Sequence, residues 1–166
     1  MLSRIQQRLI DTSAITAEQL ASLEKEANQT RTNPEDLLIE RGYISEHSLA
    51  KLKSELFELP FVDLEEVEIP DEVLRLLPQS VAEHYQIVIF QKKGTQLGIA
   101  LVDATNYHGI EAIDFWAKKE GYAYTLYITT SSGCRAALRK YTAFKKEVSD
   151  ALEVLEERAV IVKRDR

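Results

Sequence analysis

The segment RTNPEDLLIERGYISEHSLAKL, residues 31–52, resembles an earlier segment of the same chain, RLIDTSAITAEQLASL, residues 8–23. Matching residues lie at a fixed offset, so that Ile44 follows Ile15 by 29 positions. Self-similarity at a fixed offset usually marks a duplicated supersecondary unit. Because two copies are too few for an extended repeat array, we expect two units packed on each other.

Each copy has the pattern of two helices joined by a tight turn. Thr16 and Ser45 stand where a hydroxyl can accept from backbone N–H groups of the second helix, which predicts an N-cap. Gly42 stands where the first helix of copy two must end with a positive φ, and Ser13 takes that place in copy one. We therefore predict two helix-turn-helix units within residues 1–57.

The start of the second copy is itself a helix-start pattern. Asn33 can cap a helix, and Pro34 fits the first helical position because that position needs no N–H donor. Glu35 and Asp36 follow, and acidic side chains stabilise the positive end of the helix dipole. A helix beginning at Pro34 is the simplest prediction.

Composition bounds the function. The chain has 166 residues, 45% hydrophobic and 29% charged, which is ordinary for a globular protein. The net charge of −6 argues against a nucleic-acid partner, including a helix-turn-helix DNA binder, because such binding needs clustered Lys and Arg. No apolar run is long enough to insert into a membrane, and Cys134 has no cysteine partner for a disulfide.

Acidic residues gather between Glu55 and Glu72, a stretch with no Lys or Arg. We favour a solvated connector for this stretch and keep the alternative that it docks a basic partner. The exposed face of the helical repeat is a second candidate for a partner surface. The candidate partner-surface residues are Asp63, Glu65, Glu66 and Glu68.

The second half of the chain predicts a small sheet subdomain, and so an α+β fold. The apolar runs around Gly94 predict a β-hairpin, and YAYTLYITT at 122–130 predicts a strand. The resulting order, β-β-α-β-α, is preceded by an extended or edge segment at 58–70 and two short helices. We place divisions at 1–57 (helical repeat), 58–85 (connector and short helices), 86–142 (sheet subdomain) and 143–166 (C-terminal charged helix or linker).

Several local features accompany this prediction. Ser80 is predicted to cap the second short helix, and Ser131-Ser132 to cap the helix that ends near Tyr141. Phe115 is assigned to the apolar face of the helix at 106–119. The final stretch carries an apolar stripe that must face its own domain, a second copy or a further domain. The stripe residues are Phe144, Val148, Ala151, Leu152 and Leu155.

Motifs for catalysis or metal binding do not appear. The chain lacks the G-x-x-x-x-G-K-[ST] loop that cradles ATP phosphates, and its three histidines show no metal-ligand spacing. We interpret Cys134 as a packed thiol and Asp103 as a turn or cap residue. We therefore assign no catalytic, metal or cofactor-binding residues and predict that the chain is not an enzyme.

The ordered series of segments resembles the N-terminal domain of the general secretory pathway protein E family. These are the assembly ATPases of type II secretion and type IV pili. The resemblance covers roughly residues 3–142. It rests on LLIERGYISEHSLAKL, LPFVDLEEVEI, LLPQSVAEHYQIVIF, LGIALVDATN and CRAALRKY in that order, with LPFVDL the most specific piece.

This resemblance implies a non-catalytic adaptor, because the family's ATPase motifs lie in a separate region. It implies docking on the cytoplasmic part of an inner-membrane secretion or pilus platform protein. The chain would then be cytoplasmic and peripheral to the inner membrane through that partner. An ATPase domain or a second copy of the chain are further partners.

One branch of the family binds cyclic di-GMP with its helical repeat, where each copy opens with Arg-Leu-Gly. Here the copies open with Arg4-Ile5-Gln6 and Asn33-Pro34-Glu35, so we expect no cofactor and keep cyclic di-GMP as a disfavoured alternative. Glu35 would place a negative charge near an anionic ligand. The nucleotide-site residues under this alternative are Arg4, Leu9, Ile10, Leu38, Ile39 and Gly42.

Overall fold

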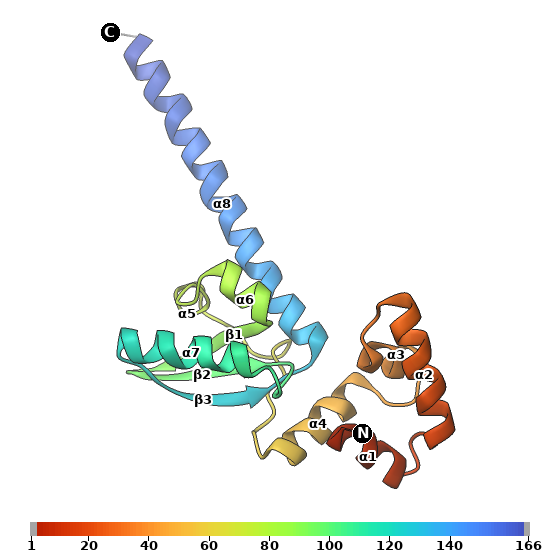
Figure 1. The fold of residues 1–166 in the computed structure, drawn as a ribbon. Helices are drawn as coiled ribbons and strands as arrows, with labels where there is room; N and C mark the ends of the chain where they lie inside the picture. The colour runs from red at the N-terminus through yellow and green to blue at the C-terminus, as the bar shows by residue number, and fades with distance from the viewer. Residues whose placement is uncertain (1–2, 165–166) are drawn as a thin grey trace.

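The computed structural model describes the backbone of residues 3–164 and the side chains of residues 3–141 and 150–159. A helical repeat lies beside a sheet subdomain, and a long helix projects away from both (Figure 1). Helices combine with one small sheet, which confirms the predicted α+β class.

The repeat consists of four helices, α1 (Arg4–Asp11), α2 (Ala17–Thr30), α3 (Pro34–Glu40) and α4 (Glu46–Phe57). The predicted caps are present: Thr16 accepts from the Gln19 N–H at 3.1 Å, and Ser45 accepts from the Ser48 N–H at 3.1 Å. Asn33 caps α3 with Pro34 at its first position. The two predicted helix-turn-helix units are therefore confirmed.

The two turns are left-handed at the predicted places. Gly42 has a φ of +78°, and Ser13 has a φ of +60° despite carrying a side chain. A positive φ costs more conformational free energy at serine than at glycine, because serine has a Cβ atom. The turn of copy one is therefore intrinsically less favourable than the turn of copy two. The apolar faces behind these turns form one core, made of Leu9, Ile15, Leu20, Leu23, Ala27, Leu37 and Leu38.

The sheet subdomain contains the elements α5 (Asp71–Leu74), α6 (Gln79–Tyr85), β1 (Ile87–Lys93), β2 (Gln96–Leu101), α7 (Tyr107–Glu120), β3 (Ala123–Ile128) and α8 (Ser131–Arg164). Its strands form one sheet in the order β1-β2-β3. β1 and β2 run antiparallel, whereas β2 and β3 run parallel and are joined through α7. Helices α5, α6 and α8 contact β1, and α7 contacts β3 (Figure 1).

The connector after α4 packs against the sheet subdomain. Phe61 forms a parallel bridge with Ile128, where the Val62 N–H donates to the Ile128 carbonyl at 2.9 Å. Leu64 and Ile69 are buried in the same core as β1 and β2. The predicted edge pairing is thus confirmed at Phe61, and the connector buries its apolar side chains while Glu65, Glu66 and Glu68 stay exposed.

Four local predictions were wrong. Pro78 precedes α6, so Ser80 lies inside that helix and is not its cap. The Thr130 hydroxyl accepts from the Gly133 N–H at 2.9 Å, so Thr130 caps α8 in place of Ser131-Ser132. Phe115 is 73% exposed, because the buried face of α7 is supplied by Ile113 and Ala117.

The fourth concerns the C-terminal region. The helix that begins at Ser131 and the expected charged helix at 143–166 are one continuous helix, α8, through Arg164. Leu152 and Leu155 of the predicted stripe are exposed, while the side chains of Phe144 and Val148 lie outside the described residues. The divisions placed at residues 57, 85 and 142 remain predictions.

Candidate functional site

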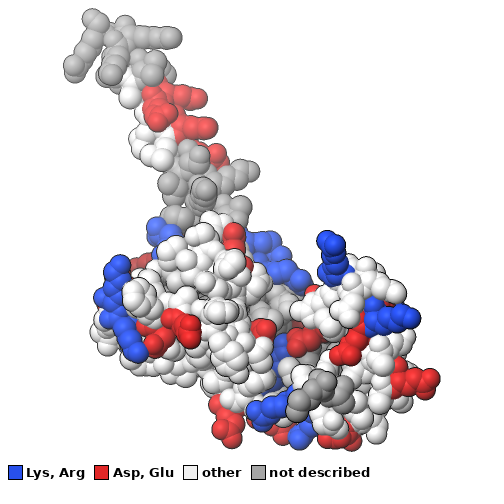
Figure 2. Space-filling model, in the orientation of Figure 1, with Lys and Arg blue, Asp and Glu red and all other residues white. Residues whose placement is uncertain are grey.

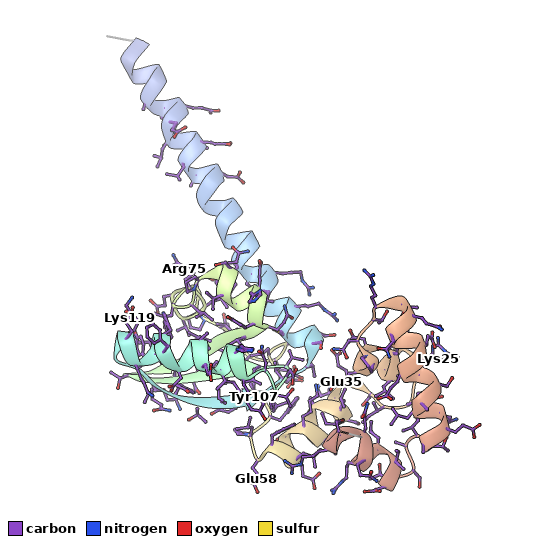
Figure 3. All side chains as sticks on the ribbon, in the orientation of Figure 1. Lys25, Glu35, Glu58, Arg75, Tyr107 and Lys119 are labelled. Atoms are coloured by element: carbon purple, nitrogen blue, oxygen red, sulfur yellow. The ribbon has the colours of Figure 1, made fainter. Side chains whose placement is uncertain are left out.

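One face of α4 joins the helical repeat to the sheet subdomain. Glu46, Ala50 and Lys53 lie on this face because they are spaced four and three residues apart. The face lies against Val102, which follows β2, and against Thr129, Thr130 and Ser131, where the chain passes from β3 into α8. We call these residues the joint. Figure 3 labels Glu35, which belongs to the same joint, on the side of the repeat that faces the sheet subdomain.

Lys53 is the charged centre of the joint. It is 4% exposed, and its Nζ donates to the Glu35 carboxylate at 2.5 Å and to the Val102 carbonyl at 3.2 Å. A buried ammonium group needs such partners, because it loses its hydration when it leaves water. Lys53 therefore links α3, α4 and the end of β2 through one side chain.

Glu46 makes the second polar link. Its two carboxylate oxygens accept from the backbone N–H and the hydroxyl of Ser132, each at 2.7 Å. The first N–H groups of a helix have no intrahelical acceptor, and they carry partial positive charge. A carboxylate of the repeat thus occupies the start of α8, a place where helices commonly hold anions.

A cavity of about 10 Å³ lies within the joint, lined by Lys53, Glu35, Val102, Thr129 and Ser131 among others. The Thr129 hydroxyl is buried there and has no hydrogen-bond partner among the described residues. Its neighbour Thr130 is also buried, but uses its hydroxyl to cap α8. The joint is consequently a packed polar contact and not an open ligand cleft.

The residues of the disfavoured nucleotide site lie in different surroundings: some are in the core of the repeat, one lines the joint and one is in an exposed turn. Leu9 and Leu38 are each 2% exposed in the core of the repeat, and Ile10 packs against that core. Ile39 lines the joint cavity. Gly42 lies in the exposed turn before α4, with open space around its Cα.

The two opening segments of the repeat have acquired internal partners. The Arg4 guanidinium lies over the Phe57 ring, 5.8 Å from its centroid. In the second copy, Asn33 caps α3 and Glu35 pairs with Lys53. Arg4, Asn33 and Glu35 thus have partners within the repeat, and the Gln6 amide likewise donates to the Glu24 carboxylate of α2.

The acidic residues of the connector differ from one another in their surroundings. Asp63 is turned inward, where it accepts from the Glu65 N–H at 3.0 Å and lies 3.0 Å from a His47 ring nitrogen. Glu65, Glu66 and Glu68 are exposed and form no ion pair among the described residues. The buried Leu64 and Ile69 hold these three carboxylates on the surface.

The thiol of Cys134 and the carboxylate of Asp103, which could in principle act in catalysis, have structural roles here. Burial raises the pKa of the Cys134 thiol to about 12, so the thiolate is scarce at neutral pH. Asp103 accepts from the Thr105 N–H and hydroxyl, as its predicted turn role requires. Among the described residues, no three His, Cys, Asp or Glu side chains gather as a metal site. No described helix combines the length and hydropathy needed to span a membrane.

Sequence reasoning missed the residues that build the joint, namely Glu46, Lys53 and Thr129. One pattern pointed to Lys53: it continues the buried spacing of Leu49 and Ala50 along α4, where an apolar residue is expected. Glu46 had no comparable pattern, because its partner is 86 residues away in the chain.

The MshEN domain family matches residues 57–148. The chain is 24% identical over 165 residues to the type IV pilus assembly ATPase PilB of Myxococcus xanthus, covering 95% of this chain and 29% of that protein. It is 25% identical over 140 residues to PilB of Thermus thermophilus, covering 83% of this chain and 15% of that protein. The chain therefore spans less than a third of each of these relatives.

Solved structures share the fold. A structure of MshE with cdg superposes with a TM-score of 0.68 at 21% identity, covering 84% of this chain and 99% of that chain. The N-terminal domain of XpsE superposes with a TM-score of 0.62 at 18% identity, covering 84% of this chain and 97% of that chain.

The fold and these matches together define the class of protein. The chain is an N-terminal domain of the kind carried by type II secretion and type IV pilus ATPases. The chain belongs to the MshEN domain family.

Proposed function

We propose that the chain is a non-catalytic adaptor domain. It docks on the cytoplasmic part of an inner-membrane secretion or pilus platform protein, so it works in the cytoplasm at the membrane surface. Its family membership supports the connection to these machines. The polar groups of the joint bond the two subdomains to each other. This arrangement fits a domain that couples two parts of a machine better than it fits a catalytic site.

One observation carries the docking proposal. Glu65, Glu66 and Glu68 are exposed and unpaired among the described residues, on a connector fixed by buried Leu64 and Ile69. Because the backbone that carries these carboxylates is already fixed, binding orders only their side chains, and less conformational entropy is lost than for a flexible loop. This surface is suited to a partner rich in Lys and Arg.

The test measures binding to purified cytoplasmic fragments of platform proteins by biolayer interferometry at low and high salt. We expect salt-sensitive binding, weakened about tenfold by the pair Glu65→Lys and Glu66→Lys. The pair Glu111→Lys and Glu120→Lys on α7 has the same charge change elsewhere and should bind normally. Absence of binding to every platform fragment, or equal binding by both pairs, would contradict the proposal.

A second candidate is a cyclic di-GMP sensor, favoured by the fold shared with MshE in its structure with cdg. Arg4 would have to leave Phe57 to stack on a guanine, and Glu35 would have to tolerate a nearby phosphate. An amide NMR titration with cyclic di-GMP tests this. Saturable shifts around residues 4–10 and 33–42 that vanish in Arg4→Ala would support the sensor, whereas no shifts at millimolar ligand would exclude it.

A further inference from the structure

The projecting part of α8 exposes a large apolar face. Leu152, Val154 and Leu155 are 55%, 48% and 59% exposed, although such side chains are usually buried. The acidic residues of this stretch are Asp150, Glu153, Glu156 and Glu157, and they show in red along the helix in Figure 2. An amphipathic helix of this kind needs an apolar, positively charged receptor.

The sheet subdomain carries a receptor of that chemistry at the free edge of β1. A groove of about 370 Å³ lies between the connector and the end of this strand. Val67, Pro70, Val73 and Phe90 supply apolar lining, and Lys92 and Lys93 supply positive charge. Neither Lys92 nor Lys93 forms an ion pair among the described residues, and the Lys92 ammonium lies 5.6 Å from the centroid of the Tyr122 ring.

The chain cannot fill this groove with its own helix while α8 stays intact. Cys134, Ala137 and Tyr141 bury the first turns of α8 in the core, and the helix then continues unbroken to Arg164. At a rise of about 1.5 Å per residue, Leu152 lies about 16 Å beyond Tyr141, further along the axis. The helix that enters the groove must come from another molecule.

We propose that α8 of one copy of this chain docks in the β1 groove of a second copy. Leu152 and Leu155 contact the apolar lining, and the acidic residues beside them face Lys92 and Lys93. This contact is heterologous, because each copy offers a helix on one side and a groove on the other, so assemblies larger than dimers form. Glu68 on the groove rim opposes the docked helix by its charge.

Sedimentation velocity of the 166-residue chain over a concentration series tests the proposal. We expect self-association that weakens as the salt concentration rises, because salt screens the attraction between the acidic residues of α8 and the two lysines of the groove. The pair Leu152→Ser and Leu155→Ser should raise the dissociation constant more than tenfold, as should Lys92→Glu with Lys93→Glu. Glu68→Gln should strengthen association. Phe115→Ser, another exposed apolar residue, and Lys25→Glu, another exposed lysine, serve as matched controls and should associate normally.

A mixing experiment separates this contact from pairing between two α8 helices. The α8 variant keeps an intact groove and the groove variant keeps an intact α8, so their mixture should form one-to-one dimers that grow no further. If instead the groove variant associates as the native chain does and only the α8 variant is monomeric, α8 pairs with itself and the proposal fails. A native chain that stays monomeric at millimolar concentration also overturns it.

Discussion

Glu46 and Ser132 are joined by two hydrogen bonds of 2.7 Å, although 86 residues separate them in the chain. The carboxylate belongs to the helical repeat and the two donors belong to the start of α8. The contact therefore ties the position of the repeat to the helix that projects from the sheet subdomain.

Glu46→Ala should lower the free energy of unfolding by about 2 kcal/mol, because two charge-assisted hydrogen bonds at a helix start are lost. Urea unfolding followed by circular dichroism measures it. Glu40→Ala removes an exposed carboxylate of the same repeat and should change stability by less than about 0.5 kcal/mol. Equal effects of the two changes would show that the contact contributes nothing specific.

Glu35→Ala should cost about 3 kcal/mol, since it leaves the Lys53 ammonium buried with only the Val102 carbonyl. The Glu35 side chain is 31% exposed, so water offsets part of the loss and the lower end of the usual range applies.

The pair Lys53→Met with Glu35→Gln should recover most of that stability, because no buried charge remains. A double-mutant cycle by urea denaturation measures the coupling between the two side chains. A pair variant as unstable as Glu35→Ala alone would show that the loss comes from packing and not from charge.

Thr129 and Thr130 should respond oppositely to the same change. Thr129→Val removes a buried hydroxyl that has no hydrogen-bond partner in the described part of the chain, and it should raise the free energy of unfolding by about 1 kcal/mol. Thr130→Val removes the cap on the Gly133 N–H and should lower it by about 1 kcal/mol. Thermal unfolding of both variants checks the signs, and a loss in both would mean that the Thr129 hydroxyl is satisfied in solution.

Stability should fall at alkaline pH. Burial raises the pKa of Cys134 and of Tyr141 to about 12 in the folded chain, above their ordinary values of 9.0 and 10.0. Between these values the unfolded chain releases protons that the folded chain retains, so stability present below about pH 9 is lost progressively towards pH 12. Urea midpoints from pH 7 to 11 measure the slope.

Tyr141→Phe should make the alkaline slope shallower, because one of the shifted groups is removed. It should also lower stability at pH 7, since the Tyr141 hydroxyl donates to the carbonyls of Leu74 and Leu77. An unchanged slope would mean that Tyr141 does not titrate differently in the folded and unfolded chains.

Local patterns predicted the helical repeat well, because its caps and turns depend on residues a few positions apart. Ser13 illustrates this, since its match to Gly42 in the duplicated copy predicted its left-handed backbone. The failures have a different origin. Phe115 resembles a core residue, but only the packing of α7 on the sheet decides that Ile113 is buried and Phe115 is not.

The candidate site shows the same division. The acidic connector is visible as a charge pattern, yet only the structure turns Asp63 inward towards His47 and leaves Glu65 outside. The joint had no complete sequence pattern, because a carboxylate, an ammonium and a helix start have to be assembled from three distant segments.

The sequence alone determined the duplicated helices, the hairpin, the family resemblance and the lack of a phosphate-binding loop, since these depend on spacing and composition. The tertiary structure decided that Glu35 neutralises Lys53, that Glu46 occupies the start of α8 and that Leu152 and Leu155 of α8 remain exposed. The physical reason is that burial and charge pairing depend on which surfaces meet, and chain folding alone brings those surfaces together.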